Sequence, residues 1–516
     1  MRTGVGGIRL STTVPESEEQ KLAAAPDQTW AATTKMDRSL AHSLAFRATT
    51  SWASQILSWA SFLIVARLLA PSDFGIAAMA LVIFPYLRYL GDIGIPTTVL
   101  TFRELTDEQL AQLNTVGLVF ALGCFGIAVA IAHPLSLFFR IPKLAVVTIV
   151  ACTALLPQGF RSVSEGLLNR DMRFGLLSWI ELIRSLIAAV STLVLAYLGY
   201  GYWALILGNV ISTVVRCVMI IVARPRGFAI PRRASIGKEM RFGWHVVVSY
   251  LAWSSYERLD NVTAGRVLGQ GALGFYAMAW NLANAPIEKV TSLVTTIIPS
   301  YLAAMKHDMA ALRRYLRTLT EGVALATFPA TIGLALVSNE LIPFALGDRW
   351  RGAIVPLQVL AVYTSFRSIV SLLPKVLTSV GNARFVMWND LRALIILPIA
   401  FYIGSRWGTG GIAFGWVLAY PLVALPLYWK AFTTIGMTAG EYVRGLRPAI
   451  DATIVMSVAV LLLKWKAPLG HSLLLRLVVE IAVGAAAYVA TLLLLHRERA
   501  TVLLQMVKSF RRKKAA

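Results

Sequence analysis

The sequence predicts an all-α polytopic membrane protein with about fourteen transmembrane helices. Of its 516 residues, 57% are hydrophobic and only 15% are charged, whereas soluble domains carry about a quarter charged residues. Apolar runs of about 20 residues, the length that crosses a bilayer, recur along the whole chain. The short alternating segments of an outer-membrane barrel are missing from the sequence.

The candidate spans follow one another with mostly short loops between them. They cover residues 46–69, 74–99, 114–133, 144–166, 176–198, 202–223, 242–264, 272–299, 318–338, 353–373, 386–404, 411–430, 447–463 and 472–495. Alternate loops are basic, and these carry Arg170, Arg173, Arg224, Arg226, Arg232, Arg233, Lys238, Arg241, Lys306, Arg313, Arg314, Arg317, Arg444 and Arg447. The positive-inside rule places these loops in the cytoplasm. An even number of spans then places both termini there, which agrees with the basic C-terminal run KSFRRKK.

One stretch of sequence occurs twice. ARLLAPSDFGIAAMA and GRVLGQGALGFYAMA align without gaps at an offset of 199 residues, which pairs Arg67 with Arg266 and Gly75 with Gly274. The copies lie at the ends of the first and seventh spans, so both point the same way across the membrane. Parallel repeats of this kind are typical of transporters built from two similar bundles. We expect the halves to superpose, with each glycine allowing a tight turn between its paired spans.

The repeat indicates how the chain is divided. We predict a disordered cytoplasmic tail (1–43), a first lobe of six spans (44–224), a basic cytoplasmic linker (225–241), a second lobe of six spans (242–430), two further spans (431–495) and a basic cytoplasmic tail (496–516). The linker is the longest cytoplasmic connection, which is where two halves should be joined.

The sequence does not indicate metal, redox or nucleotide chemistry. Cys124, Cys152 and Cys217 lie singly in apolar runs, without metal or redox spacing. No phosphate-binding loop or zinc-protease motif is present, so we expect no metal, no cofactor and no ATP hydrolysis. The net charge of +23 lies mostly in loops beside anionic lipid headgroups. With no soluble module to hold it, nucleic acid is not an expected partner.

Polar stripes run along helix faces within the spans, at spacings of three and four residues. Their charged and amide members are Arg47, Arg88, Asp92, Arg161, Glu165, Glu181, Arg184, Glu257, Asp260, Asn281, Asn284, Glu288 and Lys375, and Arg258 lies directly beside Glu257. A charge at the bilayer centre costs about 2.5–3.5 kcal/mol on insertion scales, so each should face a watery cavity or a partner. Two interpretations stay open for Arg161–Glu165 and Glu181–Arg184: a structural ion pair or a cavity wall. The serines of the first span suit close helix packing as well as a cavity.

Several of these stretches resemble a known family. ARLLAPSDFGIAAMALVI and LGDIGIPTTVL resemble the opening of Wzx-type polysaccharide flippases, which belong to the multidrug/oligosaccharidyl-lipid/polysaccharide (MOP) exporter superfamily. ERLDNVTAGRVLGQGALGFYAMA resembles the start of their second lobe. The resemblance covers about residues 44–495. The chain departs from the family pattern at Ala70, where relatives often have Gly, and in its long polar N-terminal tail.

The resemblance implies two pseudo-symmetric six-helix lobes that form a V around a central cavity, plus two C-terminal helices. It implies alternating-access export of an undecaprenyl-pyrophosphate-linked oligosaccharide from the cytoplasmic to the periplasmic leaflet of the bacterial inner membrane, for surface polysaccharide biosynthesis. The residues here that would supply the family's cationic cavity are Arg88, Arg161, Arg184, Arg258, Lys289 and Arg367, with Asn281 and Asn284 for sugar hydroxyls. Arginine suits a diphosphate because its fork donates two hydrogen bonds at once. A polysaccharide polymerase and a chain-length regulator are expected partners, together with membrane lipids.

Three carboxylates are candidates for coupling export to an H⁺ or Na⁺ gradient: Glu257, Asp260 and Glu288. Glu257 and Asp260 lie one turn apart on the same helix face. Two carboxylates so close resist ionising together, so one should take up a proton or cation more readily. Asp260 also matches a position where members of the resembled family carry an acidic group.

Two classes of alternative function stay open at this point. A lipid II flippase or a drug/cation antiporter of the same superfamily would share the fold, although the arginines argue against the antiporter. A membrane polysaccharide polymerase or ligase would be an enzyme and would need a large periplasmic loop with catalytic Arg or His residues. The longest outer loop, near SNELIPFALGDRWRG, is short, so the expected protein is not an enzyme.

Overall fold

The computed structural model describes residues 54–102, 104–232, 235–237, 239–244, 247, 251, 258–304, 308–466 and 472–497, with the backbone alone in 289–304. Within these ranges the chain is almost entirely helical and has no β-strand. Ten of the described helical segments are long and apolar enough to cross a bilayer. The prediction of an all-α polytopic membrane protein is therefore confirmed, while the total of about fourteen spans stays a prediction.

The first described helix is Ser54–Leu68. The following helices of the N-terminal half are α3 (Pro71–Ala80), α4 (Phe84–Asp92), α5 (Ile95–Thr101), α6 (Asp107–Phe139), α7 (Leu144–Cys152), α8 (Leu155–Arg170), α9 (Phe174–Tyr197) and α10 (Tyr202–Ala223). Those of the C-terminal half are α12 (Leu259–Thr263), the π-helical η1 (Ala264–Leu268), α13 (Gly269–Ala304), α14 (Met309–Leu346), η2 (Asp348–Ala353), α15 (Ile354–Val370), α16 (Leu373–Ser379), α17 (Ala383–Gly404), η3 (Ser405–Trp407), α18 (Gly408–Ile435), α19 (Ala439–Lys466) and α20 (Leu473–Leu495).

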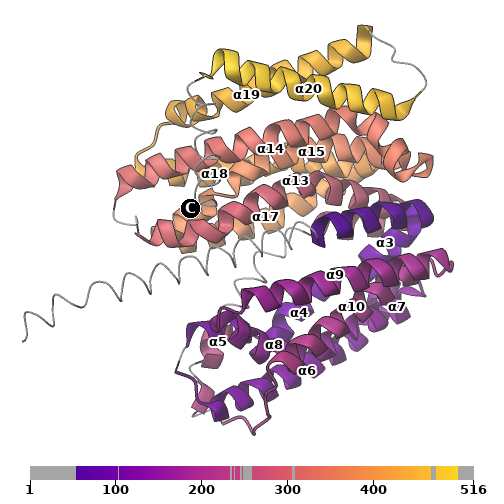
Figure 1. Cartoon of the computed structure of the whole chain (residues 1–516), viewed down its shortest axis with the longest axis vertical. Helices are drawn as coiled ribbons and strands as arrows, with labels where there is room; N and C mark the ends of the chain where they lie inside the picture. The colour runs from indigo at the N-terminus through magenta and orange to yellow at the C-terminus, as the bar shows by residue number, and fades with distance from the viewer. Residues whose placement is uncertain are drawn as a thin grey trace, which may run out of the picture.

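The helices form two groups, one from each half of the chain (Figure 1). In the N-terminal group α4 to α10 lie together, with α9 against α10 and α6 against α8. In the C-terminal group α13 to α18 lie together, and α19 and α20 pack on the outer side against α14. Helix α3 contacts α7 and α10 of the first group and packs extensively against α13 of the second.

The second predicted span is broken into α3, α4 and α5. Pro85 and Pro96 each stand in the first turn of the helix that follows a break, where a missing N–H costs nothing. Between α4 and α5, Ile93 and Gly94 have left-handed φ values of 41° and 66°. Discontinuous helices of this kind are typical of transporters, because unwound backbone is tolerated in a membrane only beside protein or a cavity.

The repeated glycines explain how the two groups meet. A Cβ added at Gly75 would collide with the carbonyl oxygen of Gln270, and one added at Gly274 would collide with the carbonyl oxygen of Pro71. Pro71 and Gln270 are themselves separated by the repeat offset, so the two contacts are reciprocal. The expectation that each glycine allows a tight turn between its paired spans was wrong. Both glycines lie inside helices, and their lack of a side chain lets α3 and α13 cross backbone to backbone.

The repeated arginines also contact opposite groups. Arg67 donates to the carbonyl oxygens of Phe344 and Ala345 at the end of α14, with an Nε–O distance of 2.8 Å to Ala345. Arg266 lies over the ring of Phe138 at the end of α6, at 5.4 Å from its centroid. A cation beside the last carbonyls of a helix is favoured by the helix dipole. The two arginines therefore hold the ends of the long helices around the α3–α13 crossing, which we call the joint.

Candidate functional site

A cavity of about 860 Å³, which we call the large cavity, lies between α3 and the C-terminal group. Its polar lining residues are Arg258, Asn261, Asn281, Asn284, Glu288, Arg367, Ser371, Lys375, Asn389 and Asp390. Helix α3 contributes Ala78 to an apolar wall, and the residues directly after the helix contribute Leu81 and Val82. The cavity therefore borders both halves of the chain, and its volume is in the range of about 300–1,000 Å³ that small-ligand sites occupy.

Arg367 of α15 is the most firmly positioned cation of the large cavity. Its Nη1 donates to Asn284 Oδ1 at 2.9 Å, and its guanidinium lies 5.8 Å from the ring centroid of Trp280. Trp280 and Asn284 lie one turn apart on α13, so they hold the guanidinium together. The amide oxygen and the aromatic ring help to orient the guanidinium at the cavity wall.

The charge of the large cavity is positive on balance. Arg258, Arg367 and Lys375 line it, against Glu288 and Asp390. Among the described residues, neither Arg258 nor Lys375 forms an ion pair with a carboxylate. A cavity with these cations, and with Trp280 and Tyr420 in its wall, is suited to an anion of two charges that carries hydroxyl-rich groups.

Asp260 does not line the large cavity. It is fully buried, and its carboxylate accepts from Tyr276 Oη at 2.8 Å and from Trp416 Nε1 at 3.1 Å. Asn261 adds its backbone N–H at 2.6 Å and its side-chain amide at 3.0 Å. The carboxylate thus ties α12 to α13 and α18 through four donors, which satisfy a buried acidic group.

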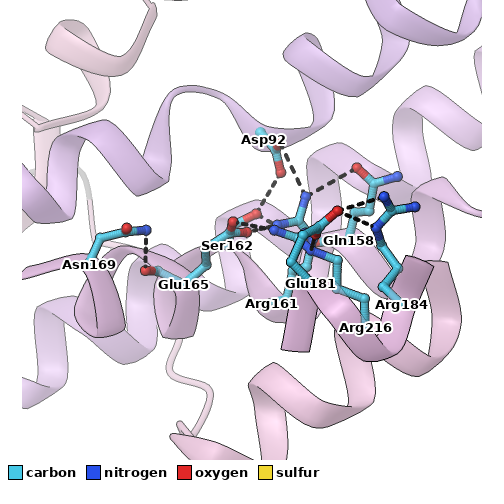
Figure 2. A network of polar contacts seen from close by, with 9 residues as sticks. All are labelled: Asp92, Gln158, Arg161, Ser162, Glu165, Asn169, Glu181, Arg184 and Arg216. Atoms are coloured by element: carbon cyan, nitrogen blue, oxygen red, sulfur yellow. Dashed lines mark hydrogen bonds and ion pairs between the residues drawn. The ribbon is translucent and has the colours of Figure 1, made fainter. Parts of the chain in front are cut away.

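The N-terminal group holds a network of alternating charges that spans four helices (Figure 2). Arg161 of α8 pairs with Glu165 on the next turn and lies 3.9 Å from Asp92 Oδ2 of α4. Arg216 of α10 reaches Glu165 Oε1 at 2.7 Å and Glu181 Oε2 at 3.3 Å. The last pair joins Arg184 Nη2 to Glu181 Oε1 at 2.6 Å. The network contains three arginines and three carboxylates, so its charges balance.

A second cavity, which we call the small cavity, lies beside this network and has a volume of about 360 Å³. The first described helix, α8, α9 and α10 surround it. Its polar lining residues are Ser54, Gln55, Ser58, Glu165, Asn169, Ser178, Glu181, Arg184, Ser185 and Arg216. Of the two interpretations open for the Glu181–Arg184 pair, both therefore hold: the pair exists, and it also forms cavity wall.

The residues predicted for substrate or ion binding fall into four places. Arg258, Asn281, Asn284, Glu288 and Arg367 line the large cavity, Arg184 lines the small cavity, and Arg161 and Asp260 are buried in the polar contacts described above. Arg88 is half-buried on α4 with its guanidinium 5.0 Å from the ring centroid of Tyr89, outside the lining of both cavities. Glu257 and the side chain of Lys289 lie outside the described residues.

Sequence reasoning missed two residues that the structure brings to these sites. Asp390 lines the large cavity, and Arg216 joins Glu165 to Glu181. Lys375, a member of the predicted polar stripes, also lines the large cavity. The signal for Arg216 was available, because it is a lone arginine within an apolar span. The signal for Asp390 was weak, because one carboxylate near a span end is common.

The comparisons with known proteins agree with this architecture. A family model described as "Polysaccharide biosynthesis protein" matches residues 64–355. The chain belongs to this family. It is 25% identical over 400 residues to the lipopolysaccharide biosynthesis protein WzxC of Escherichia coli (strain K12), covering 74% of this chain and 79% of WzxC. It is 26% identical to the succinoglycan biosynthesis transport protein ExoT of Rhizobium meliloti (strain 1021), covering 86% and 91% of the two chains. The resemblance to Wzx-type flippases is thereby confirmed.

Solved structures show the same fold. The lipid II flippase MurJ in an inward closed conformation matches with a TM-score of 0.67 at 14% identity, over 88% of this chain and 99% of that chain. An inward-facing multidrug resistance MATE family transporter of the MOP superfamily matches with a TM-score of 0.60 at 16% identity, over 74% and 94%. This polysaccharide biosynthesis protein therefore has the MOP superfamily fold.

Proposed function

We propose that this member of the polysaccharide biosynthesis family exports an undecaprenyl-pyrophosphate-linked oligosaccharide from the cytoplasmic to the periplasmic leaflet of the bacterial inner membrane. The single observation that carries the proposal is the large cavity, where Arg258, Arg367 and Lys375 surround a space of about 860 Å³. A diphosphate needs cations at fixed positions, and Arg367 is oriented by its contacts with Asn284 and Trp280. The polyprenyl chain can stay in the lipid while the head group crosses.

Alternating access would follow from movement about the joint. The joint lies in the first turns of α3 and α13, and α3 directly follows the loop between the first and second spans, which the basic-loop pattern predicts on the periplasmic side. With both termini in the cytoplasm, a closed joint leaves the opposite, cytoplasmic end as the entrance. Breaking the reciprocal glycine contact would then open the periplasmic end.

The driving force would come from the membrane potential, an ion gradient or both. Each negative charge expelled from a negative interior gains about 2.3 kcal/mol per 100 mV, and a diphosphate carries roughly two charges. Of the carboxylates predicted for H⁺ or Na⁺ coupling, Glu288 lines the large cavity, whereas Asp260 is held by four donors. We therefore assign the coupling role to Glu288 ahead of Asp260. A polymerase and a chain-length regulator would act on the exported unit.

The proposal is tested by complementation of a bacterial strain that lacks its own polysaccharide flippase. The full chain should restore polymer at the cell surface, and Arg367→Gln should lose most of that restoration at an equal protein level. Arg406→Gln is the matched control, because Arg406 is exposed in η3 outside both cavities. Equal polymer from Arg367→Gln and Arg406→Gln would show that the large cavity does not bind the diphosphate.

A further inference from the structure

The small cavity is chemically unlike the large one. Glu165 and Glu181 are each bound by two arginines of the network, and Arg216 contacts both. These contacts fix both carboxylates in position while the charges of the network balance. An anion gains little from a site whose cations are already paired, since the carboxylates would repel it. The small cavity therefore suits an uncharged polar ligand.

The lining of the small cavity supplies hydrogen-bonding groups of both kinds. Ser58, Ser178 and Asn169 bring hydroxyl and amide groups to the wall, and carboxylate oxygens of the network bring acceptors. The hydroxyl groups of Ser58 and Ser178 donate to backbone carbonyls one turn back, at 2.7 Å and 2.8 Å, so their oxygens can still accept. A ligand with several neighbouring hydroxyl groups matches such a wall, because each hydroxyl donates once and accepts twice.

The two cavities border the same helix hairpin. The helix Ser54–Leu68 and α3 fold back on each other, because Phe62 and Phe74 contact edge to face with centroids 5.9 Å apart. On a straight helix these residues would be about 18 Å apart. Ser58 and Ala78 each lie four residues further from the bend than this pair. Ser58 lines the small cavity and Ala78 lines the large one.

We propose that the small cavity is a glycan subsite that holds the uncharged sugar residues nearest the diphosphate while the large cavity holds the diphosphate itself. The proposal rests on the proposed function, and it divides recognition between the halves of the chain. The large cavity recognises the anion shared by every cargo of this type. The small cavity adds affinity only when hydroxyl-bearing sugars are attached, so it distinguishes a loaded lipid from a bare one.

The experiment measures the affinity of the full chain, in lipid nanodiscs, for two probes. One is undecaprenyl pyrophosphate, and the other is the same lipid carrying an uncharged disaccharide of hexoses. The wild-type chain should bind the sugar-bearing lipid about tenfold more tightly, as expected for one or two net hydrogen bonds between uncharged groups. Ser58→Leu fills the small cavity without removing a network charge. It should reduce this preference to less than about twofold and leave the affinity for the bare lipid unchanged.

Two further variants keep the test independent of misfolding. Asn169→Ala removes an amide from the cavity wall without adding bulk and should also reduce the preference. Ser191→Leu is the matched control, because the Ser191 hydroxyl likewise donates to the backbone one turn back in α9, at 2.6 Å from the Ile187 oxygen, but lies outside the cavity. This control should keep the full preference.

The possible failures are distinguishable. If the wild-type chain binds both lipids equally, or Ser58→Leu and Asn169→Ala both keep the preference, the glycan subsite is wrong while the diphosphate site stands. If Ser58→Leu lowers the affinity for both lipids to the same extent, the glycan subsite is also wrong. If the wild-type chain binds neither lipid, the proposed function itself fails.

Discussion

Arg161 in the N-terminal group and Arg367 in the C-terminal group are both arginines within apolar spans, and their surroundings differ. Arg161 is buried and meets the carboxylates of Glu165 and Asp92. Arg367 is half-buried at a cavity wall, where it contacts Asn284 and Trp280. The difference teaches that an arginine in a membrane span serves the fold when it is buried among carboxylates. An arginine that lines a cavity can also reach a ligand.

The largest effect should come from breaking the buried network. Arg161→Met leaves Asp92 and Glu165 without this partner in a buried position, which typically costs about 3–5 kcal/mol. The purified protein should melt at a markedly lower temperature in detergent. The double variant Arg161→Met with Glu165→Gln removes charge from both sides and should recover part of the loss. A normal melting temperature for Arg161→Met would show that Arg161 does not stabilise the fold.

Arg367→Gln should give the opposite result. We expect the melting temperature to change little, because glutamine can still donate to Asn284. The affinity for undecaprenyl pyrophosphate should fall by about 10- to 100-fold, since hydrogen bonds to charged groups contribute roughly 1.5–3 kcal/mol. Melting and lipid binding measured on one preparation check both parts. A large loss of thermal stability with unchanged binding would make Arg367 a structural residue like Arg161.

The joint provides a comparison in which the two halves should behave alike. Gly75→Ala and Gly274→Ala each place a methyl group against a backbone carbonyl of the other half, and overpacking of this kind costs about 1–3 kcal/mol. Because the contacts are reciprocal, the two variants should lose similar stability in a melting experiment. Gly123→Ala, with no atom near its added Cβ, is the control. Strongly unequal losses at Gly75 and Gly274 would argue against the symmetry of the joint.

The smallest effect should come from an exposed ion pair. Asp348 and Arg351 lie 2.9 Å apart in η2 with both side chains mostly exposed to solvent. Exposed pairs contribute about 0–1 kcal/mol because water screens them. Arg351→Gln should therefore melt within about a degree or two of the wild-type protein. A loss as large as that of Arg161→Met would show that burial is not what separates the two kinds of arginine.

Several features of this protein could be predicted from residues alone. The length and composition of the apolar runs indicate membrane helices, since a helix needs about 20 consecutive apolar residues to cross the hydrocarbon core of a bilayer. The repeat pairs Gly75 with Gly274, because the constant offset of 199 residues is visible in the sequence itself. The stripe containing Asn281, Asn284 and Glu288 indicates a polar face, because helical periodicity alone shows which residues share a side.

Only the tertiary structure decided what each polar face meets. Periodicity places Arg161 beside Glu165, but Asp92 and Arg216 reach that pair from other helices. The repeated glycines read as turn residues until α3 and α13 are seen to cross at them. The physical reason is the same in both cases. A helix presents its side chains in an order that the sequence dictates. The charge or backbone opposite each side chain comes from segments far away in the chain. The packing of those segments decides whether the side chain is neutralised, buried or open to a ligand.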